Sequence, residues 1–447
     1  MKILLVIFDG LGDRPSAHLD GLTPLEAAKT PNLDQLAAAS ATGRFVPVEP
    51  WLPVGTALAH HVMFGYQLDE YPDRAVLMAL ARGYPPAPGE VLFAARFASV
   101  VAHDDHYELK ERFIRDAEED CAELARAIAA WSGHGLEFSY RYCGRGDGLL
   151  TITGGASPDV TDSDPLGLDL PVVAIEPLET AGDELAAMET SNALNSYLGW
   201  AHEVLSDHAI NQRRGDAGEL PINMVITKWS GVLPDLEPFE RKHGLRAAGI
   251  PAEEVVDGVQ RAVGMDVFGI QRSNDLTADL DARLTRAFQL FAEGYDFVNV
   301  HTKEPDAIAH WSDPGRKRDA IAALDSGLSG HMDRLLDDDL VVTITGDHCT
   351  PTAWEGKELG EFNDQHSGEP VPILVRARHA LVDGVPSFGE RSVAQGSLGT
   401  VEGRHLMRML LTFADRTNVA GMRPAPRLTS YRPKSVNPLA PRLRVRS

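Results

Sequence analysis

Short apolar runs rich in β-branched residues recur along the chain, and helix-like stretches lie between them. The first run spans 3–8 and ends at Asp9-Gly10, without the polar alternation of a strand that faces water. Continuous runs of this kind are typical of strands buried on both faces of a parallel sheet. Similar runs occupy 222–226, 297–300, 340–345 and 371–375, and helical patterns occupy 31–39, 252–262, 280–292 and 316–335. The alternation predicts a doubly wound α/β sheet that contains these strands.

The alternation is interrupted between about 90 and 218. A long acidic, helix-like stretch covers 111–131, and a Gly- and Asp-rich region covers 144–169. We therefore expect a discontinuous core formed by 1–90 and 219–415, with a smaller α+β substrate or lid domain inserted at 91–218. The last 27 residues hold six Arg, one Lys and five Pro but no acidic residue, so 416–447 is expected to form a basic arm. Such an arm would bind an anionic partner or, as we expect, lie on the acidic surface of its own or a neighbouring subunit.

Composition excludes several classes of protein. The formal net charge of -23 opposes general nucleic-acid binding, because the phosphate backbone attracts the opposite charge. No apolar run is long enough to cross a bilayer, and the run after Met1 is too short for a signal peptide, so a cytoplasmic protein that does not bind membranes is expected. The three cysteines suggest no disulfide framework. A homo-oligomer is compatible with the sequence.

A carboxylate and an imidazole are spaced to meet after the run at 297–300. Asp306 and His310 lie four residues apart, which places them on one face of a helix, where both can reach one divalent ion. Alone, the pair favours a simpler interpretation, in which Asp306 caps a solvated first turn.

Further ligands arrive from other segments. The run at 340–345 delivers Asp347 and His348 at its carboxyl end, where open α/β sheets bind ligands; His366 precedes the last run, and Asp9 ends the first. Together with Asp306 and His310, these side chains are enough for two divalent cations, with Mn or Zn favoured and Co or Mg also compatible. The absence of cysteine clusters excludes a structural zinc knot.

Thr56 is the candidate nucleophile. It lies at a loop-to-helix junction within 53–60, where a helix N-terminus favours the negative charge of a phosphate. A hydroxyl beside a divalent cation also loses its proton more readily near neutral pH. The alternative is that Thr56 is only an N-cap residue.

The order of these segments resembles the alkaline phosphatase superfamily, and within it the archaeal-type 2,3-bisphosphoglycerate-independent phosphoglycerate mutases. The matching stretches are 7–15, 23–34, 55–66, 300–310, 345–351 and 366–368. The resemblance implies an alkaline-phosphatase-like α/β core with two metal ions. One ion would be held by Asp9, Thr56, Asp347 and His348, and the other by Asp306, His310 and His366. It also implies phosphoryl transfer through a phosphorylated hydroxyl, with Lys303 stabilising charge on the phosphoryl oxygens, although Lys303 could also be a surface residue.

The chain departs from the family pattern around the substrate. Thr56-Ala57 replaces Ser-Asp, and Thr at this position looks like the diesterase branch of the superfamily. Trp229 stands where the family has a small or basic residue. The stretches 93–99 and 110–115 match substrate-handling motifs incompletely, whereas 160–165 and 211–214 still look like the family. They supply the substrate-binding candidates Arg96, Arg112, Arg115, Asp162, Asp164 and Arg214.

Three functions follow as hypotheses. The first is mutase-like phosphoryl transfer through phospho-Thr56 on a small phosphorylated carboxylic acid, with the inserted domain excluding water. The second is transfer or hydrolysis of a phosphonate or a nucleotide-linked phosphodiester in specialised phosphonate metabolism, which Thr56, Ala57 and Arg96 favour. The third is a non-catalytic metal-binding scaffold, against which the complete ligand set argues. In the first two, the partner is a small anionic substrate.

Overall fold

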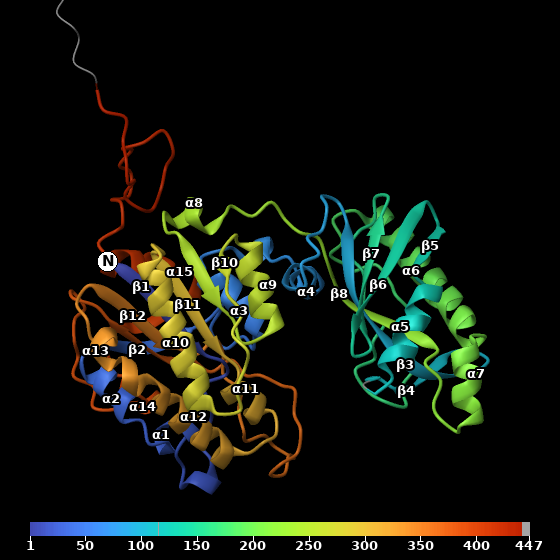
Figure 1. Ribbon diagram of the computed structural model, residues 1–447, viewed down its shortest axis with the longest axis horizontal. Coiled ribbons are helices and arrows are strands. Elements are labelled where there is room, and N and C mark those ends of the chain that lie inside the picture. The colour runs from blue at the N-terminus through green and yellow to red at the C-terminus, as the bar shows by residue number, and fades with distance from the viewer. Residues whose placement is uncertain (115, 440–447) are drawn as a thin grey trace, which may run out of the picture. The chain divides into compact units, whose positions relative to one another are not determined.

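The computed structural model describes residues 1–114 and 116–439, which divide into two compact units (Figure 1). Unit 1 combines the chain up to Tyr71 with the chain from Leu236 onward, and unit 2 comprises Pro72–Asp235. Of the substrate-binding candidates, Arg115 lies outside the described residues.

Unit 1 is built on a sheet that, within the described residues, has eight strands in the order β10-β9-β11-β1-β12-β13-β2-β14. All of these strands run parallel except β13, which is antiparallel to both of its neighbours. The central strands carry continuous apolar sequence because both of their faces are covered. The strands are β1 (Lys2–Phe8), β2 (Ala41–Val46), β9 (Ala247–Ile250), β10 (Asp266–Val267), β11 (Phe297–Thr302), β12 (Leu340–Thr345), β13 (Val371–Arg376) and β14 (Gly399–Glu402).

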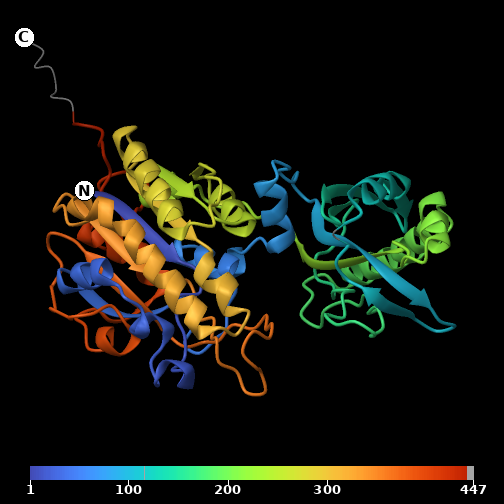
Figure 2. The same cartoon turned by 60° about the horizontal axis from the view of Figure 1, so that its bottom comes forward.

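Helices cover both faces of this sheet. On one face α10 (Leu276–Ala292) and α12 (Pro314–Leu328), the yellow and orange helices that lie side by side in Figures 1 and 2, pack with α2 (Pro31–Ala38) over β1. On the other face the ring of Phe297 in β11 contacts Phe64, which follows α3, and Phe239 of α8. The predicted α/β fold with a doubly wound sheet is confirmed. The further helices are α1 (Pro24–Ala27), α3 (Thr56–Met63), α8 (Phe239–His243), α9 (Glu254–Ala262), α11 (Glu304–Ala309), α13 (Met332–Leu335), α14 (Glu390–Val393) and α15 (Gly403–Phe413).

Unit 2 is an α+β unit with a sheet of its own. Its strands follow the order β4-β3-β7-β6-β5, and β8 pairs with β3. Phe93 and Phe97 of β3 share a buried apolar cluster with Tyr197 and Leu198 of the long helix α6. The elements are α4 (Arg74–Ala81), β3 (Val91–Ala102), β4 (Tyr107–Glu111), α5 (Glu118–Ala127), β5 (Ala130–Gly133), β6 (Leu136–Gly144), β7 (Asp147–Thr153), α6 (Glu184–Ser206), α7 (Ala209–Asp216) and β8 (Met224–Gly231).

Three sequence-based expectations differ from these elements. The run at 222–226 does not join the core sheet: its last three residues begin β8, which pairs antiparallel with β3 of unit 2. The chain divides between the units at 71/72 and 235/236, whereas 90/91 and 218/219 were expected, because α4 packs on β3 and β8. The expected helix at 111–131 is shorter, since α5 is flanked by β4 and β5.

The described part of the basic arm lies on acidic side chains of unit 1. Lys434 Nζ is 3.0 Å from Asp296 Oδ2, and Arg427 pairs with Glu237. Thr417 and Tyr431 form an isolated bridge that folds the arm back on itself.

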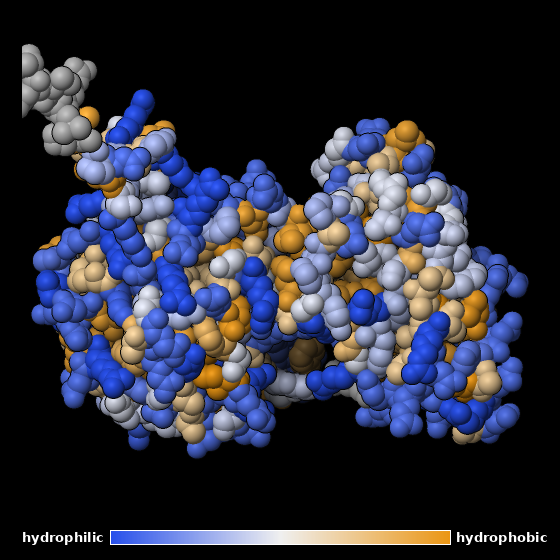
Figure 3. Space-filling model, turned by 45° about the horizontal axis from the view of Figure 1, so that its top comes forward, coloured by the Kyte–Doolittle hydropathy of each residue, from blue (hydrophilic) through white to orange (hydrophobic). Residues whose placement is uncertain are grey.

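Hydrophilic residues cover most of the face drawn in Figure 3. Among the described residues, no helix has the length and apolar character needed to span a membrane.

Candidate metal centre

Three neighbouring strands of unit 1 end at the same level of the sheet. Ile7 of β1 pairs with His301 of β11 on one side and with Thr345 of β12 on the other. The next residues along each strand therefore meet beyond the carboxyl edge, where Asp9 and the pair Asp347 and His348 are almost completely buried. His348 Nε2 lies 3.2 Å from Asp9 Oδ1 and 3.4 Å from Asp347 Oδ2.

Thr56 faces this group of side chains. It is the first residue of α3, and the N-cap position belongs to Gly55, so Thr56 does not cap the helix. Its hydroxyl oxygen is 3.1 Å from His348 Nε2 and 3.4 Å from Asp9 Oδ1. The first predicted ligand set, Asp9, Thr56, Asp347 and His348, is thus brought together.

The second predicted set surrounds Asp306. This carboxylate lies buried in α11, where Lys303 takes the N-cap position, so Asp306 is not the capping residue of a solvated turn. Its oxygens lie 3.2 Å from His310 Nε2 and 3.4 Å from His366 Nε2. The His348 and His366 rings stack with their centroids 3.9 Å apart, so the two sets adjoin.

Backbone carbonyls fix two of the imidazole rings. His310 Nδ1 is 2.6 Å from the Asn363 carbonyl oxygen, and His366 Nδ1 is 2.7 Å from that of Val54. A carbonyl only accepts hydrogen bonds, so Nδ1 donates in both rings, and Nε2 is the atom of each ring that faces Asp306. Second contacts of this kind orient the histidine ligands of metal ions.

Lys303 is embedded among the carboxylates. Its Nζ lies 2.9 Å from Asp9, 2.8 Å from Asp306 and 3.1 Å from Glu253. Burial lowers the pKa of Lys303, but these three carboxylates outweigh burial and raise that pKa well above its usual range. Burial likewise raises the pKa of Asp9 and Asp306, yet Lys303 and the adjacent histidines hold both well below the usual range. Lys303 therefore contacts the carboxylates and is no free surface residue.

The Asp347 carboxylate and the neutral His348 ring are suited to bind cations. Burial and the neighbouring Asp9 carboxylate raise the pKa of Asp347 well above its usual range. Asp347 Oδ2 is buried and accepts no hydrogen bond within the part of the chain that is described. Burial also lowers the pKa of His348 to about 4, so its ring is neutral at pH 7, as a metal ligand must be. Oxygen and nitrogen donors around an orphaned carboxylate oxygen fit divalent ions.

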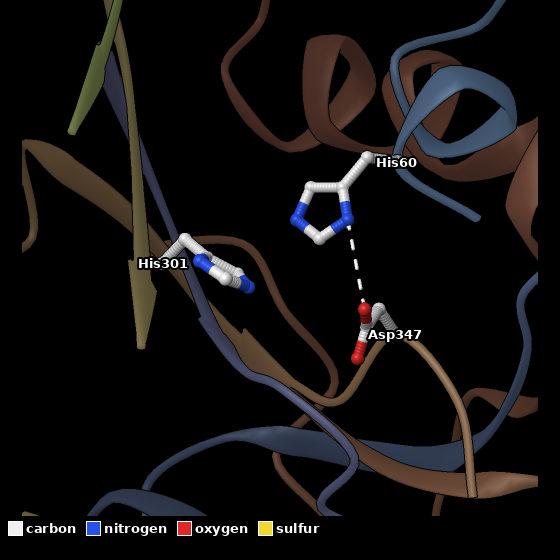
Figure 4. Close-up of side chains that lie close together, drawn as sticks. All are labelled: His60, His301 and Asp347. Atoms are coloured by element: carbon white, nitrogen blue, oxygen red, sulfur yellow. Dashed lines mark ion pairs between the residues drawn. The ribbon is translucent and has the colours of Figure 1, made fainter. Parts of the chain in front are cut away.

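Two buried histidines beside this centre were not predicted from the sequence. His60 of α3 and His301 of β11 point toward Asp347 (Figure 4), and His60 Nδ1 is 3.6 Å from Asp347 Oδ2. His60 Nδ1 lies 2.9 Å from the Thr56 carbonyl oxygen, and His301 Nε2 lies 3.2 Å from Asp9 Oδ2. His60 thus holds Thr56 in position, and His301 does the same for Asp9. The spacing of four between Thr56 and His60 was the signal that could have revealed one of them.

The described substrate-binding candidates all lie in unit 2. Asp164 Oδ2 accepts two bonds from Arg112 at 2.9 and 2.7 Å and lies 3.2 Å from Lys228 Nζ, and Asp162 accepts the Trp229 N–H nearby. Arg96 pairs with Asp147 at 2.6 Å and adjoins this group, since the guanidinium groups of Arg96 and Arg112 both lie over the Phe113 ring. Arg214 pairs with Asp120 at 3.2 Å. Lys228 is a cation that the sequence did not single out.

Comparison with known proteins settles the family. A model of the metalloenzyme superfamily matches residues 1–412. The chain belongs to this superfamily. It is 33% identical over 428 residues to the 2,3-bisphosphoglycerate-independent phosphoglycerate mutase of Methanopyrus kandleri, a match that covers 94% of this chain and 98% of that protein. Mutase 2 of Methanocaldococcus jannaschii is 32% identical over 445 residues, which cover 97% and 98% of the two chains. The chain is therefore also a member of the family of these mutases.

Solved structures agree with this assignment. A protein from Pyrococcus horikoshii superposes with a TM-score of 0.74 at 30% identity, covering 94% of this chain and 99% of that one. The cofactor-independent phosphoglycerate mutase of Thermoplasma acidophilum gives a TM-score of 0.65 at 29% identity, with 93% and 100% covered. The chain is thus an enzyme of the metalloenzyme superfamily, and its family implies divalent metal ions.

Proposed function

We propose that the protein transfers a phosphoryl group through Thr56, in the manner of a phosphoglycerate mutase, between positions of a small phosphorylated carboxylic acid. The observation that carries this proposal is the position of the Thr56 hydroxyl, 3.1 Å from His348 Nε2 and 3.4 Å from Asp9 Oδ1 at the start of α3. The relatives from Methanopyrus kandleri and Methanocaldococcus jannaschii are named as phosphoglycerate mutases, which supports the substrate class.

The residues take distinct roles in this proposal. Two divalent ions, Mn or Zn, would be held by the Asp9, Thr56, Asp347 and His348 set and by the Asp306, His310 and His366 set, and would offset phosphoryl charge. The Thr56 oxygen attacks phosphorus, the substrate's P–O bond breaks, and the departing oxygen takes up the proton that Thr56 loses. The other hydroxyl of the same acid then attacks phospho-Thr56, which gives the phosphorylated product and returns the proton to the Thr56 oxygen. Lys303 holds the Asp9 and Asp306 carboxylates in place and adds positive charge beside the transferring group.

Unit 2 would supply the anion-binding groups. Arg112 and Lys228 share the Asp164 carboxylate and remain partly exposed, so both cations are arranged to meet an anionic substrate. Arginine suits carboxylate and phosphate because its planar fork donates two parallel hydrogen bonds. Arg96, Asp162 and Arg214 are the further members of this proposed substrate set.

A second candidate function is favoured by the residue after the nucleophile. Ala57 is buried beside Thr56 and offers no carboxylate there. A site without that carboxylate could accept a phosphonate or a nucleotide-linked phosphodiester, which would be transferred or hydrolysed instead.

Substrate assays distinguish the two functions. The Mn²⁺-loaded protein is incubated with 3-phosphoglycerate, and in parallel with a nitrophenyl monoester and a nitrophenyl diester, and products are followed by phosphorus NMR. Interconversion with 2-phosphoglycerate, together with a phosphorylated peptide that contains Thr56, is the expected result. Turnover of the diester without any interconversion would overturn the mutase proposal in favour of the second candidate.

A further inference from the structure

Thr350 touches both predicted ligand sets. It follows β12 and is completely buried. Its hydroxyl oxygen lies 2.6 Å from Asp306 Oδ1 and 3.0 Å from His348 Nδ1. Asp306 belongs to one predicted ion site and His348 to the other, so this hydroxyl is a direct link between the two.

Counting protons fixes the direction of both hydrogen bonds. The ionised Asp306 carboxylate only accepts, so the single hydroxyl proton of Thr350 is donated to Asp306 Oδ1. The lone pairs of the same oxygen then accept the proton on His348 Nδ1. His348 consequently presents the lone pair of Nε2 to the Thr56 hydroxyl, which lies 3.1 Å away and can donate to it. His310 and His366 have backbone carbonyls for this purpose, whereas His348 depends on a side chain.

The surrounding backbone is shaped for this contact. Gly10 has φ 62, and a Cβ on it would lie 2.6 Å from the Thr350 hydroxyl oxygen and 2.8 Å from Asp306 Cβ. Only a residue without a side chain therefore permits Thr350 and Asp306 to meet. Thr350 is also held by its backbone, since its N–H donates to the Gly12 carbonyl at 3.2 Å and its carbonyl accepts from Lys317 Nζ at 2.9 Å.

We propose that Thr350 is a positioning residue that couples the two ion sites, because its hydroxyl sets the tautomer of His348 and the orientation of Asp306 together. The inference rests on the two ligand sets of the proposed function, but it concerns hydrogen bonds that exist without any ion. Removing a second contact of a metal ligand weakens metal binding by about 10- to 100-fold. Loss of this hydroxyl weakens binding at both sites at once.

The first test is a measurement on the unmodified, metal-free protein. Nitrogen-15 NMR of the histidine rings reports which nitrogen of His348 carries the proton. A proton on Nδ1 is expected, and a proton on Nε2 would overturn the proposal without any variant. In Thr350→Val the Nδ1 tautomer loses its acceptor, so a shift toward the Nε2 tautomer is expected, whereas Thr350→Ser retains the wild-type spectrum.

The second test is calorimetric titration with Mn²⁺. Thr350→Val is expected to bind both ions at least tenfold more weakly, and Thr350→Ser is expected to restore both affinities. Thr343→Val is the matched control, because it removes a buried β12 hydroxyl that has no partner among the described residues. Unchanged affinity in Thr350→Val, or weakening at one site alone, contradicts the coupling. A protein that shows the expected tautomer and affinities but converts no phosphoglycerate would refute the proposed function and leave this inference intact.

Discussion

Nε2 of His348 lies 3.1 Å from the Thr56 hydroxyl oxygen, so the proposed nucleophile is within hydrogen-bonding distance of a proposed metal ligand. Thr56→Ala removes the only oxygen of that side chain and should lower phosphoryl transfer by roughly 10³-fold or more. Thr56→Ser keeps the oxygen and should retain turnover. Elemental analysis of Thr56→Ala should show weakened but not abolished ion binding, since three side chains of that set remain. Undiminished turnover in Thr56→Ala would remove the residue from the mechanism.

Chelation should destabilise unit 1. Without ions, the buried carboxylates of Asp9, Asp306 and Asp347 have Lys303 as their main compensating charge. An ion that binds only the folded state adds about 2.7 kcal/mol when its concentration is 100 times its Kd. EDTA should therefore lower the melting temperature, and Mn²⁺ should restore it.

His310→Ala should lower the amount of bound ion by one equivalent, because His310 contacts Asp306 and belongs only to the second predicted set. The exposed His379, which lies 3.6 Å from Asp415, provides the control His379→Ala. Elemental analysis that still finds two ions in His310→Ala would reject its assignment as a ligand.

Lys317 should stabilise the two loops that contain Gly12 and Thr350 beside the site. Its Nζ is fully buried and lies 2.9 Å from the carbonyl of Gly12, 3.0 Å from Asp13 and 2.9 Å from the carbonyl of Thr350. Lys317→Met leaves the Asp13 carboxylate buried without its cation and should lower the free energy of unfolding by about 3–5 kcal/mol. Lys357→Met, which breaks the exposed pair with Glu361, should change it by about 1 kcal/mol at most. Urea denaturation of both variants measures the difference, and equal effects would contradict the prediction.

Arg112 should act on substrate affinity. Its guanidinium donates two bonds to the nearly fully buried Asp164, which holds it in one orientation. A hydrogen bond to a charged group contributes about 1.5–3 kcal/mol, so Arg112→Ala should raise KM for the phosphorylated substrate about tenfold or more. The control Arg126→Ala removes an exposed arginine of α5 and should leave KM unchanged. Equal KM values for Arg112→Ala and the wild type would exclude Arg112 from the substrate set.

Glu390 should make stability fall as pH rises. Burial raises the pKa of Glu390 from 4.5 to about 7, although Thr23 donates a hydrogen bond to it at 2.6 Å. Between these two values the folded chain binds the proton more tightly than the unfolded chain, so this group lowers the free energy of unfolding as pH increases. Glu390→Gln should therefore gain stability relative to the wild type at pH 8 but not at pH 4. Urea denaturation at both pH values tests this, with the exposed Glu123→Gln as control; a constant difference would contradict it.

Some features of the site could be predicted from the sequence because strand ends have a fixed geometry. Parallel strands meet at one edge, so the polar residues after 3–8 and 340–345 were expected to converge, and Asp9, Asp347 and His348 do lie together. A spacing of four was enough to bring Asp306 and His310 within 3.2 Å. The first of these predictions rests on the common direction of parallel strands, and the second rests on helical periodicity.

Other features could not be predicted because they depend on which segments pair. The run at 222–226 has the apolar, β-prone character of the core strands, and nothing local shows that its partner is β3. His301 lies inside a strand, and its alternation with apolar neighbours does not indicate that it contacts Asp9. Thr350 belongs to a loop whose course is set by Gly10 and Lys317, residues far away in the sequence.

The position of β1 between β11 and β12 has a consequence for biosynthesis. Its first neighbour in the sheet begins at Phe297 and its second at Leu340, so β1 leaves the ribosome almost 300 residues before either partner is synthesised. Unit 2, by contrast, is contiguous and complete at Asp235. Domains generally fold as units during synthesis, so the inserted unit can acquire its structure while Asp9 is still without either flanking strand. Synthesis of unit 1, which holds the proposed metal centre, therefore starts before that of unit 2 and ends after it.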